Sequence, residues 1–459
     1  MPIRLFDTVS QSLRDFEPRV PGQVGIYVCG PTVQSEPHIG HLRSALVYDL
    51  WRRWLTYRGF TVTLVRNVTD IDDKILAVAG TEEWWALAAR MERAFDTAAS
   101  ALGILPPTIE PRATGHIGDM ITLISRLIDR GHAYAAADGS GDVYFSVASW
   151  SDYGQLTRQS PDEVESDEAN SERGKKDPRD FALWKGRKDS EPATASWESP
   201  WGLGRPGWHI ECSAMATRFL GSGFDIHGGG LDLRFPHHEN ELAQSRAAGD
   251  DFATTWLHNG LVTMNGHKMS KSVGNEMGAE DLLSQTDSAT ARYFLLAPHY
   301  RSTMDVHEGS LAEAAAAWDR IRGFARRTAD LVTAAPEVPD AFAAAMDDDL
   351  AVPAALAVLH DAVRAGNTAL DAADSAAILA RANEVAAMVN VLGLTVEADS
   401  HHATHAALGT LIDRLITERN RARADKDWAT ADRIRDDIDA AGITLEDGAD
   451  TTRWSITNG

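Results

Sequence analysis

The sequence predicts an α/β fold in its first half, built on a parallel sheet, followed by a helical second half. Two patterns support this division: a strand–turn–helix–strand succession in residues 26–66 and long alanine-rich helical runs after residue 311. A chain of 459 residues also exceeds the usual size of one domain, so two to four domains are expected. A hydrophobic content of 44% and a charged content of 24% are typical of globular proteins.

The first strand, turn and helix are predicted within residues 26–42. Residues 26–28 form a short apolar run typical of a buried strand, and Cys29-Gly30-Pro31 ends it. Helical spacing then begins after Pro37, and His38 and His41 fall in the first turn. A second strand within residues 62–73 completes a βαβ unit, which predicts a Rossmann-like parallel sheet with a site at its strand ends.

This helix start is a candidate anion site. A glycine turn before a helix exposes backbone N–H groups and the positive end of the helix dipole, and His38 and His41 would add donors. The alternative is a solvated helix start that carries two histidines by chance.

The rest of the chain divides by composition. Residues 159–176 are polar, charged and without periodicity, which predicts an exposed loop inside an insertion spanning roughly 115–195. Further helices are expected at 82–102, 118–130, 311–331, 339–365, 375–392, 407–423 and 428–441, with a linker at 395–404 before the last pair.

Several classes of protein are disfavoured by composition. No run of about 18 apolar residues occurs, and the first residues lack a signal-peptide pattern, so we expect no membrane segment and a cytoplasmic location. Two cysteines form no disulfide framework. The net charge of -23 argues against diffuse nucleic-acid binding, although a local basic stripe is compatible with it.

Four residues form a candidate metal site. Cys29 and Cys212 lie far apart in the sequence, so only the fold can bring them together. His237 and Glu241 are four residues apart on a predicted helix, a spacing that presents two ligands from one face. Zinc accepts Cys, His and carboxylate ligands, usually four in all. The alternative is that both cysteines are buried apolar residues and the histidines cap a helix.

A second candidate site is the segment Lys268-Met-Ser-Lys-Ser272, flanked by Gly266 and Gly274. Two lysines three residues apart, with hydroxyl groups beside them, can surround a polyphosphate and supply charge during nucleotidyl transfer. The flanking glycines predict a mobile loop. The alternative is a solvated surface turn.

The motifs resemble a known family. His38-Ile-Gly-His41 and Lys268-Met-Ser-Lys-Ser272 are the two signatures of class I aminoacyl-tRNA synthetases, and within that class the chain resembles the cysteinyl-tRNA synthetases. That likeness rests on the segments 27–32, 67–74, 207–215, 224–241 and 426–436. Gln34 departs from the family, which often has Tyr there, and residues 446–454 differ slightly from its usual turn.

The resemblance implies one Zn²⁺ per chain, held by Cys29, Cys212, His237 and Glu241. Zinc would separate cysteine from serine, because a thiolate is a soft ligand and a hydroxyl is a harder, much less acidic one. No editing domain is therefore expected. The residues implied to form the L-cysteine pocket are Tyr27, Gly30, Thr32, Trp208 and His227.

The resemblance also implies ATP, accompanied by Mg²⁺, as a substrate. His38, His41, Lys268 and Lys271 would be the catalytic residues, since they would stabilise charge that develops on the phosphates. Gly40 would leave room for the adenosine. The implied nucleotide contacts are His38, Gly40, His41, Asp232, Lys268, Met269, Ser270, Lys271 and Ser272.

The domains implied are a catalytic domain with an insertion, a helical bundle and a small anticodon-binding domain. Their expected bounds are 1–115 with 196–262 (catalytic), 116–195 (insertion), 263–310 (lysine-loop region), 311–394 (bundle) and 405–459 (anticodon binding). The tRNA for cysteine would contact the helical half, through arginines near 320–327 and 414–435 and through Trp428 and Trp454, and a monomer is expected. The alternative for Trp428 is plain core packing.

Two other functions fit part of the pattern. A ligase of the same lineage could pass activated cysteine to a small amine, as in the mycothiol pathway, but it would not need the basic helical pair at 407–441. A non-catalytic RNA-binding relative would have no need of His38, His41, Lys268 and Lys271. Cysteine–tRNA ligation is therefore the expected function.

Overall fold

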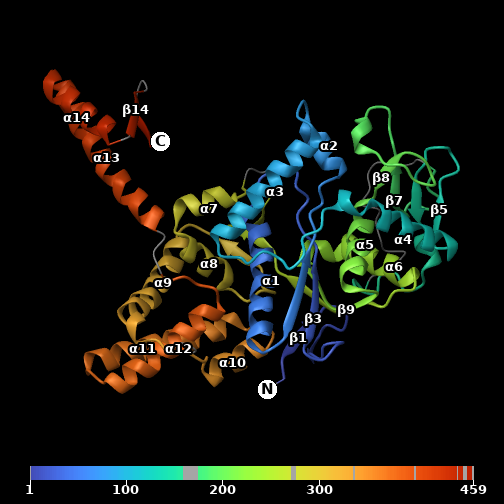
Figure 1. The fold of residues 1–459 in the computed structure, drawn as a ribbon, viewed down its shortest axis with the longest axis horizontal. Coiled ribbons are helices and arrows are strands. Elements are labelled where there is room, and N and C mark those ends of the chain that lie inside the picture. Colours follow the sequence, from blue (N-terminus) through green and yellow to red (C-terminus); the bar gives the residue numbers. More distant parts are fainter. Residues whose placement is uncertain are drawn as a thin grey trace. The chain divides into compact units, whose positions relative to one another are not determined.

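The computed structural model describes residues 2–158, 174–269, 275–333, 336–396, 400–441, 443–447 and 452–456 (Figure 1). The chain forms two compact units, Met1–Val396 and Glu397–Gly459. Most of the predicted loop at 159–176, and Ser270, Lys271 and Ser272 of the predicted lysine loop, lie outside the described residues.

The predicted parallel sheet is confirmed. In the described part of the first unit the central sheet has the order β10-β9-β3-β4, and all neighbouring pairs are parallel. Its strands are β3 (Gln23–Val28), β4 (Thr61–Arg66), β9 (Gly223–Gly230) and β10 (Phe252–Asn259), and α1 (Ile39–Tyr57) joins β3 to β4. The carboxyl ends of these strands meet at one edge.

The strand order reverses at β3. The chain passes from β3 to β4 on one side, while β9 pairs with β3 on the other side. In open α/β sheets the ligand site lies at such a switch point, outside the carboxyl ends of the strands. The helices α5 (Trp208–Leu220) and α6 (Glu239–Ala247) lie before and after β9, and both supply residues to this edge.

An antiparallel sheet, β5-β6-β7-β8, gathers beside α5 and α6 (Figure 1). It packs with α4 (Ile117–Asp129) around buried aromatic residues such as Phe145 and Trp184. Its strands are β5 (Ala133–Ala135), β6 (Val143–Phe145), β7 (Phe181–Gly186) and β8 (Gly204–Pro206).

Smaller elements complete the first half of the chain. A hairpin of β1 (Arg4–Asp7) and β2 (Ser12–Asp15) opens it, and α2 (Asp73–Ala79) and α3 (Trp84–Ala101) follow β4. A three-stranded sheet, β12-β11-β13, then follows β10. Its strands are β11 (Val262–Met264), β12 (His267–Lys268) and β13 (Met304–Val306), with α7 (Ala279–Gln285) and α8 (Ser288–Leu296) between the last two.

The helical part of the first unit contains α9 (Ser310–Arg327), α10 (Asp340–Asp347), α11 (Val352–Asp371) and α12 (Ser375–Val391). The prediction of one helical run over 339–365 is wrong, because α10 ends at Asp347. Asp349 and Leu350 have φ values of 55° and 46°, and Pro353 lies in the first turn of α11. The Asp349 carboxylate accepts hydrogen bonds from Tyr300 Oη (2.7 Å) and the Phe6 amide (2.9 Å), which holds the turn against β1.

The second unit contains α13 (Ser400–Ala424), α14 (Trp428–Ala440) and a hairpin of β14 (Ile443–Asp447) and β15 (Thr452–Ile456). Its core is a cluster of buried isoleucines at 412, 416, 434, 438 and 443. The predicted linker at 395–404 is too long, because α13 begins at Ser400. Among the helices of the described residues, none has the length and apolar character needed to cross a membrane.

Candidate active site and metal centre

A cavity of about 310 Å³ opens at the carboxyl ends of the sheet strands. Its wall is formed by the ends of β3, β9 and β10, the start of α1 and α5, and the hairpin that follows β11. Nine of the residues that the sequence singled out line it: Cys29, Gly30, Thr32, His38, Gly40, His41, Trp208, Asp232 and Met269. Gln34, where the sequence departs from the family pattern, also lies on this wall.

The start of α1 forms one side of the cavity. His38 is the N-cap residue, and its Nδ1 accepts a hydrogen bond from the Gly40 amide at 3.1 Å. The rings of His38 and His41 stack with their centroids 3.7 Å apart. A Cβ atom on Gly40 would lie 2.9 Å from two atoms of the His38 ring, so glycine is needed for this ring position. The predicted histidine pair therefore lies where an anion would meet the helix N-terminus.

The turn after β3 brings Cys29 to the other end of the cavity. The Gly30 amide donates a hydrogen bond to Asn67 Oδ1 at 3.0 Å, which ties the turn to the end of β4. A Cβ atom on Gly30 would lie 1.6 Å from the Asn67 carbonyl oxygen. Only glycine allows this close approach of the two strand ends.

Cys29, Cys212, His237 and Glu241 come together although they lie on three separate segments: the end of β3, α5, and the turn that leads into α6. Their ligand atoms all lie within 4.8 Å of one another, and all four side chains are buried. The Cys29 thiol donates to Glu241 Oε1 at 3.2 Å. His237 Nε2 lies 3.1 Å from the same oxygen but forms no hydrogen bond. His237 lies in a π-helical turn, Arg234–His238, that continues directly into α6, where Glu241 lies four residues further on.

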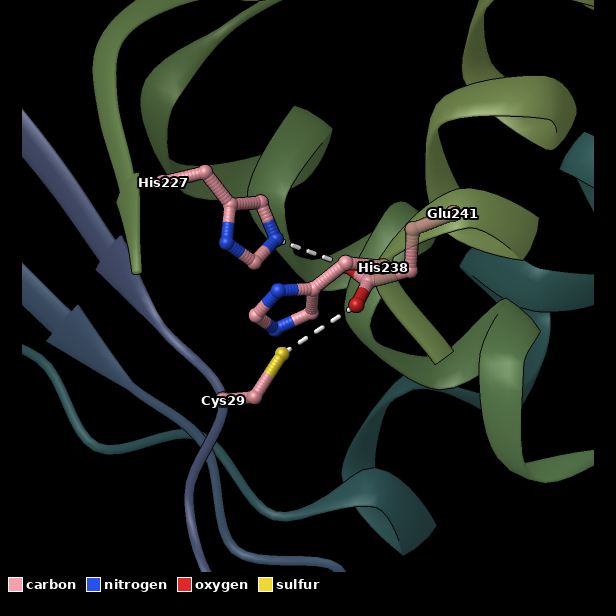
Figure 2. Close-up of side chains that lie close together, drawn as sticks. All are labelled: Cys29, His227, His238 and Glu241. Carbon is pink, nitrogen blue, oxygen red and sulfur yellow. Dashed lines mark hydrogen bonds and ion pairs between the residues drawn. The ribbon is translucent and has the colours of Figure 1, made fainter. Parts of the chain in front are cut away.

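A second donor set overlaps the first. Figure 2 shows the side chains of Cys29, His227, His238 and Glu241 close together, with Cys29 and His227 each in contact with Glu241, and the ligand atoms of these four residues also lie within 4.8 Å of one another. His227 Nε2 forms a 2.9 Å contact with Glu241 Oε2, and His238 Nδ1 lies 2.8 Å from His258 Nε2. Cys29 and Glu241 are therefore common to two alternative groups of metal ligands.

Burial sets the protonation of these groups when no metal is bound. Desolvation raises the pKa of the Cys29 thiol well above its usual range and raises the pKa of Cys212 to about 11. Desolvation lowers the pKa of His237 well below its usual value and that of His209 to about 3. The site therefore has neutral imidazoles, which can bind a metal, and protonated thiols, which must lose a proton to do so.

Several neighbours of the site were not predicted. His209 Nδ1 lies 2.9 Å from His237 Nδ1, and the Trp208 ring stacks on His237 at 4.1 Å. Lys74 lines the cavity with its ammonium 5.6 Å from the Trp208 ring centroid. The adjacent pair His237-His238 and the position of His209 beside Trp208 were the available signals in the sequence.

The remaining predicted residues lie at or near the cavity. Tyr27 and His227 are fully buried behind its wall, with ring centroids 5.4 Å apart. The main chain of Lys268 ends β12, one residue before Met269 on the cavity wall. The rest of the lysine segment lies outside the described residues.

Comparisons with known proteins show the class of protein to which the chain belongs. A family model described as the tRNA synthetases class I (C) catalytic domain matches residues 15–316. Two further models, the DALR domain and the cysteinyl-tRNA ligase anticodon binding domain, match residues 341–397 and 405–454. These matches define the class as the class I aminoacyl-tRNA synthetases.

Similar proteins of known name show which family within this class the chain belongs to. A cysteine–tRNA ligase of Clavibacter michiganensis is 60% identical over 99% of both chains, and one of Micrococcus luteus is 56% identical over 100% of both. The chain belongs to the cysteine–tRNA ligase family. In fold it is similar to a methionyl-tRNA synthetase of Mycobacterium tuberculosis bound to methionyl-adenylate, with a TM-score of 0.57, 16% identity, and coverage of 81% of this chain and 90% of that one.

Proposed function

We infer that the chain is a cysteine–tRNA ligase, which activates L-cysteine with ATP and transfers it to the terminal ribose of its tRNA. The observation that supports this best is that one cavity is lined both by Cys29 of the donor cluster and by the histidine turn of α1. The match of residues 405–454 to an anticodon binding domain favours tRNA over a small amine as the acceptor. The mycothiol-type alternative is therefore not favoured.

We propose that Cys29, Cys212, His237 and Glu241 hold one zinc ion. Two sulfur atoms, one imidazole and one carboxylate suit Zn²⁺, and the unpartnered His237 Nε2 fits a ligand role. This set is preferred to the one with His227 and His238 because it contains both thiols. When bound, zinc would supply a soft coordination position that a cysteine thiolate fills far better than a serine hydroxyl.

At the other end of the cavity, the start of α1 is proposed to bind the phosphates of ATP. The N-terminal amides of α1 and the imidazoles of His38 and His41 can donate hydrogen bonds to phosphate oxygens. The carboxylate of cysteine would attack the α-phosphorus in line, and pyrophosphate would leave. Lys268 and Lys271 would stabilise the charge on the departing phosphates, and Mg²⁺ would accompany the nucleotide.

The residues proposed to contact cysteine beyond the metal are Tyr27, Gly30, Thr32, Trp208 and His227. Three of these, Gly30, Thr32 and Trp208, lie on the cavity wall. The residues proposed to contact the nucleotide are His38, Gly40, His41, Asp232, Lys268, Met269, Ser270, Lys271 and Ser272.

The second unit is proposed to bind the anticodon end of the tRNA. Trp428 is 58% exposed, so it is available for stacking on a base and is no core residue. Arg421, Arg423 and Lys426 are exposed beside it, whereas Arg419 is buried and is excluded as a contact. The side chain of Trp454 lies outside the described residues.

The proposed organisation follows the sequence. Residues 1–115 and 196–262 would form the catalytic domain, 116–195 the insertion, 263–310 the lysine-loop region, 311–394 the bundle and 405–459 the anticodon-binding domain. We propose a monomer that acts in the cytoplasm, where tRNA and ATP are available.

A two-stage assay tests the function. Cysteine-dependent exchange of labelled pyrophosphate into ATP measures activation, and charging of a transcript of the tRNA for cysteine measures transfer. Serine in place of cysteine is the control for selection, and a transcript for another amino acid is the control for the acceptor. Exchange with cysteine but no charging of the transcript would favour a small-molecule acceptor instead.

A further inference from the structure

Arg43 lies on α1, two residues beyond His41, and only 1% of it is exposed. Its Nη1 donates hydrogen bonds to the carbonyl oxygens of Gly260 (2.9 Å) and Leu261 (3.0 Å). Its Nη2 donates to the carbonyl oxygens of His299 (3.2 Å) and Ser302 (2.8 Å). One guanidinium group therefore joins α1 to two backbone segments that are distant in sequence.

The hydrogen bonds of Arg43 are made to backbone oxygens. Within the described residues no carboxylate forms an ion pair with Arg43, and all its acceptors are backbone carbonyls. Desolvation lowers its pKa to about 10, so the group stays charged at neutral pH. A buried charge without a counter-charge is an expensive way to stabilise a fold, and an apolar side chain of similar volume is often as good or better. A role in positioning explains its presence better than stability does.

The segments that Arg43 holds lead directly to the active site. Residues 259–262 line the same cavity as His38, Gly40 and His41. Leu261 precedes β11, whose hairpin continues to Lys268, and Ser302 precedes β13, the parallel partner of β11. The arginine thus holds the two strands at the point where each enters the small sheet.

Two further contacts fix the place where α1, residues 259–262 and the segment before β13 meet. Ser44 Oγ donates to Asn259 Oδ1 at 3.0 Å, so α1 also holds the first residue of the cavity segment. A Cβ atom on Gly260 would lie 2.2 Å from the Ser302 carbonyl oxygen, so the two segments touch only because residue 260 is glycine. The carbonyls that Arg43 needs are brought together by this close approach.

We propose that Arg43 is a positioning residue for adenylate formation. It fixes residues 259–262, which form one wall of the cavity, and the β11–β12 hairpin against the histidine turn of α1. This inference rests on the proposed function, in which that turn binds ATP. Displacement of the wall would misalign the nucleotide while leaving the cysteine end, on β3, α5 and α6, in place. A misplacement of about 1 Å typically costs about a hundredfold in rate.

The test compares Arg43→Met and Arg43→Lys in the full-length enzyme by cysteine-dependent pyrophosphate exchange. Arg43→Met is expected to lower kcat about a hundredfold and to raise KM for ATP, with KM for cysteine changed less than about twofold. Arg43→Lys keeps the charge, but its single ammonium nitrogen cannot donate to all four carbonyls. We therefore expect its kcat to be about tenfold below that of the parent. Full activity of Arg43→Lys would show that charge alone matters and would overturn the positioning role.

Arg292→Met is the control for the loss of a buried arginine away from the cavity. Arg292 is equally buried and also donates to backbone carbonyls, those of Leu102 (3.0 Å) and Leu392 (2.8 Å), and in addition to Asp49 Oδ2 (2.6 Å). Unlike the segment 259–262 that Arg43 holds, Leu102 and Leu392 do not line the cavity. Loss of Arg292 is expected to lower the thermal midpoint and to leave kcat per folded enzyme within about threefold. If kcat falls equally in Arg43→Met and Arg292→Met, Arg43 has only a structural role and the positioning role is contradicted.

Two outcomes separate the inference from the proposed function. If the parent enzyme lacks cysteine-dependent exchange, the proposed function is wrong. If the parent is active and Arg43→Met has the same kcat as the parent, the inference alone is wrong. It is also wrong if Arg43→Met raises KM for cysteine by as large a factor as it lowers kcat. If Arg43→Met does not fold, the kcat and the two KM values of Arg43→Lys decide.

Discussion

Substitution of Cys212 tests most directly whether zinc lets the enzyme distinguish cysteine from serine as a substrate. Cys212→Ser removes one soft ligand and leaves a hydroxyl of similar size in a fully buried position. We expect zinc content to fall below one per chain and cysteine-dependent exchange to fall at least tenfold, measured on protein purified without added metal. A metal-free variant with full activity and undiminished rejection of serine would contradict the proposed role of zinc.

The protonation of the two thiols predicts how zinc affinity depends on pH. Because burial raises the pKa of Cys29 and Cys212, both thiols carry protons at neutral pH when no metal is bound, and zinc must displace them. Protons therefore compete with zinc, and affinity rises with pH by up to about a hundredfold per unit between pH 6 and 8. Competition with a chelator at several pH values measures this slope. A flat profile would exclude thiolate ligands.

Lys271 tests the charge supplied to the departing phosphates. Lys271→Ala is expected to slow pyrophosphate exchange by roughly ten to a thousandfold, the usual range for one contact that stabilises a transition state. Lys271→Arg keeps the charge and serves as the comparison. An unchanged rate in the alanine variant would remove Lys271 from the proposed mechanism.

At the residue level the sequence predicted which side chains would meet but not all that surround them. Cys29, Cys212, His237 and Glu241 were selected for their ligand chemistry, and the fold brings them within 4.8 Å of one another. His209 and His258 have the same ligand chemistry, but chemistry alone does not show that they adjoin the cluster. Their importance depends on contacts of 2.9 Å with His237 and 2.8 Å with His238, which only the packing of α5, α6 and β10 creates.

A substitution in α1 can test the geometry of the active site separately from the stability of the helix. Gly40→Ala places a better helix former in the first turn, yet its Cβ would lie 2.9 Å from the His38 ring. We expect the thermal midpoint to stay within about two degrees and exchange activity to fall at least tenfold.

Gly118→Ala is the control for that prediction. Gly118 occupies the same second position of its helix, α4, and a Cβ atom there would meet no atom within 4 Å. Its activity should equal that of the parent. Equal activity of the two alanine variants would mean that the position of the His38 ring has no catalytic consequence.

The helical elements show where sequence patterns fail. The helix predicted at 375–392 agrees with α12 because its ends carry ordinary signals, with Asp374 capping the start. The run at 339–365 breaks because Asp347 and Asp349 turn away to bind other elements: Asp347 pairs with Arg58 and accepts from Trp54 Nε1, and Asp349 pairs with Arg301. Apolar periodicity continues across this break, so it could not reveal these contacts with distant parts of the sequence.

At the scale of the whole molecule, the two compact units predict a division of labour. The first unit contains the cavity and the donor cluster, and the second has its own small isoleucine core. A chain that ends after Thr395 should keep cysteine-dependent exchange within about threefold. It should charge tRNA about a hundredfold less efficiently, as expected for the loss of about 3 kcal/mol of binding.

Exchange and charging measured on the same preparation check this division. The control is the full chain with Trp428→Ala, which should weaken charging alone, by a smaller factor. If truncation abolishes exchange and charging equally, the second unit contributes to activation and the division is wrong.

The chain contains two cysteines, and both are buried at the donor cluster. The protein is therefore a ready scaffold for site-specific labelling. A third cysteine placed at an exposed position, such as Thr417→Cys on α13, would react with a maleimide dye far faster than either native thiol, because those thiols are buried and have raised pKa values. Fluorescent reporters of tRNA binding can thus be attached without altering Cys29 or Cys212.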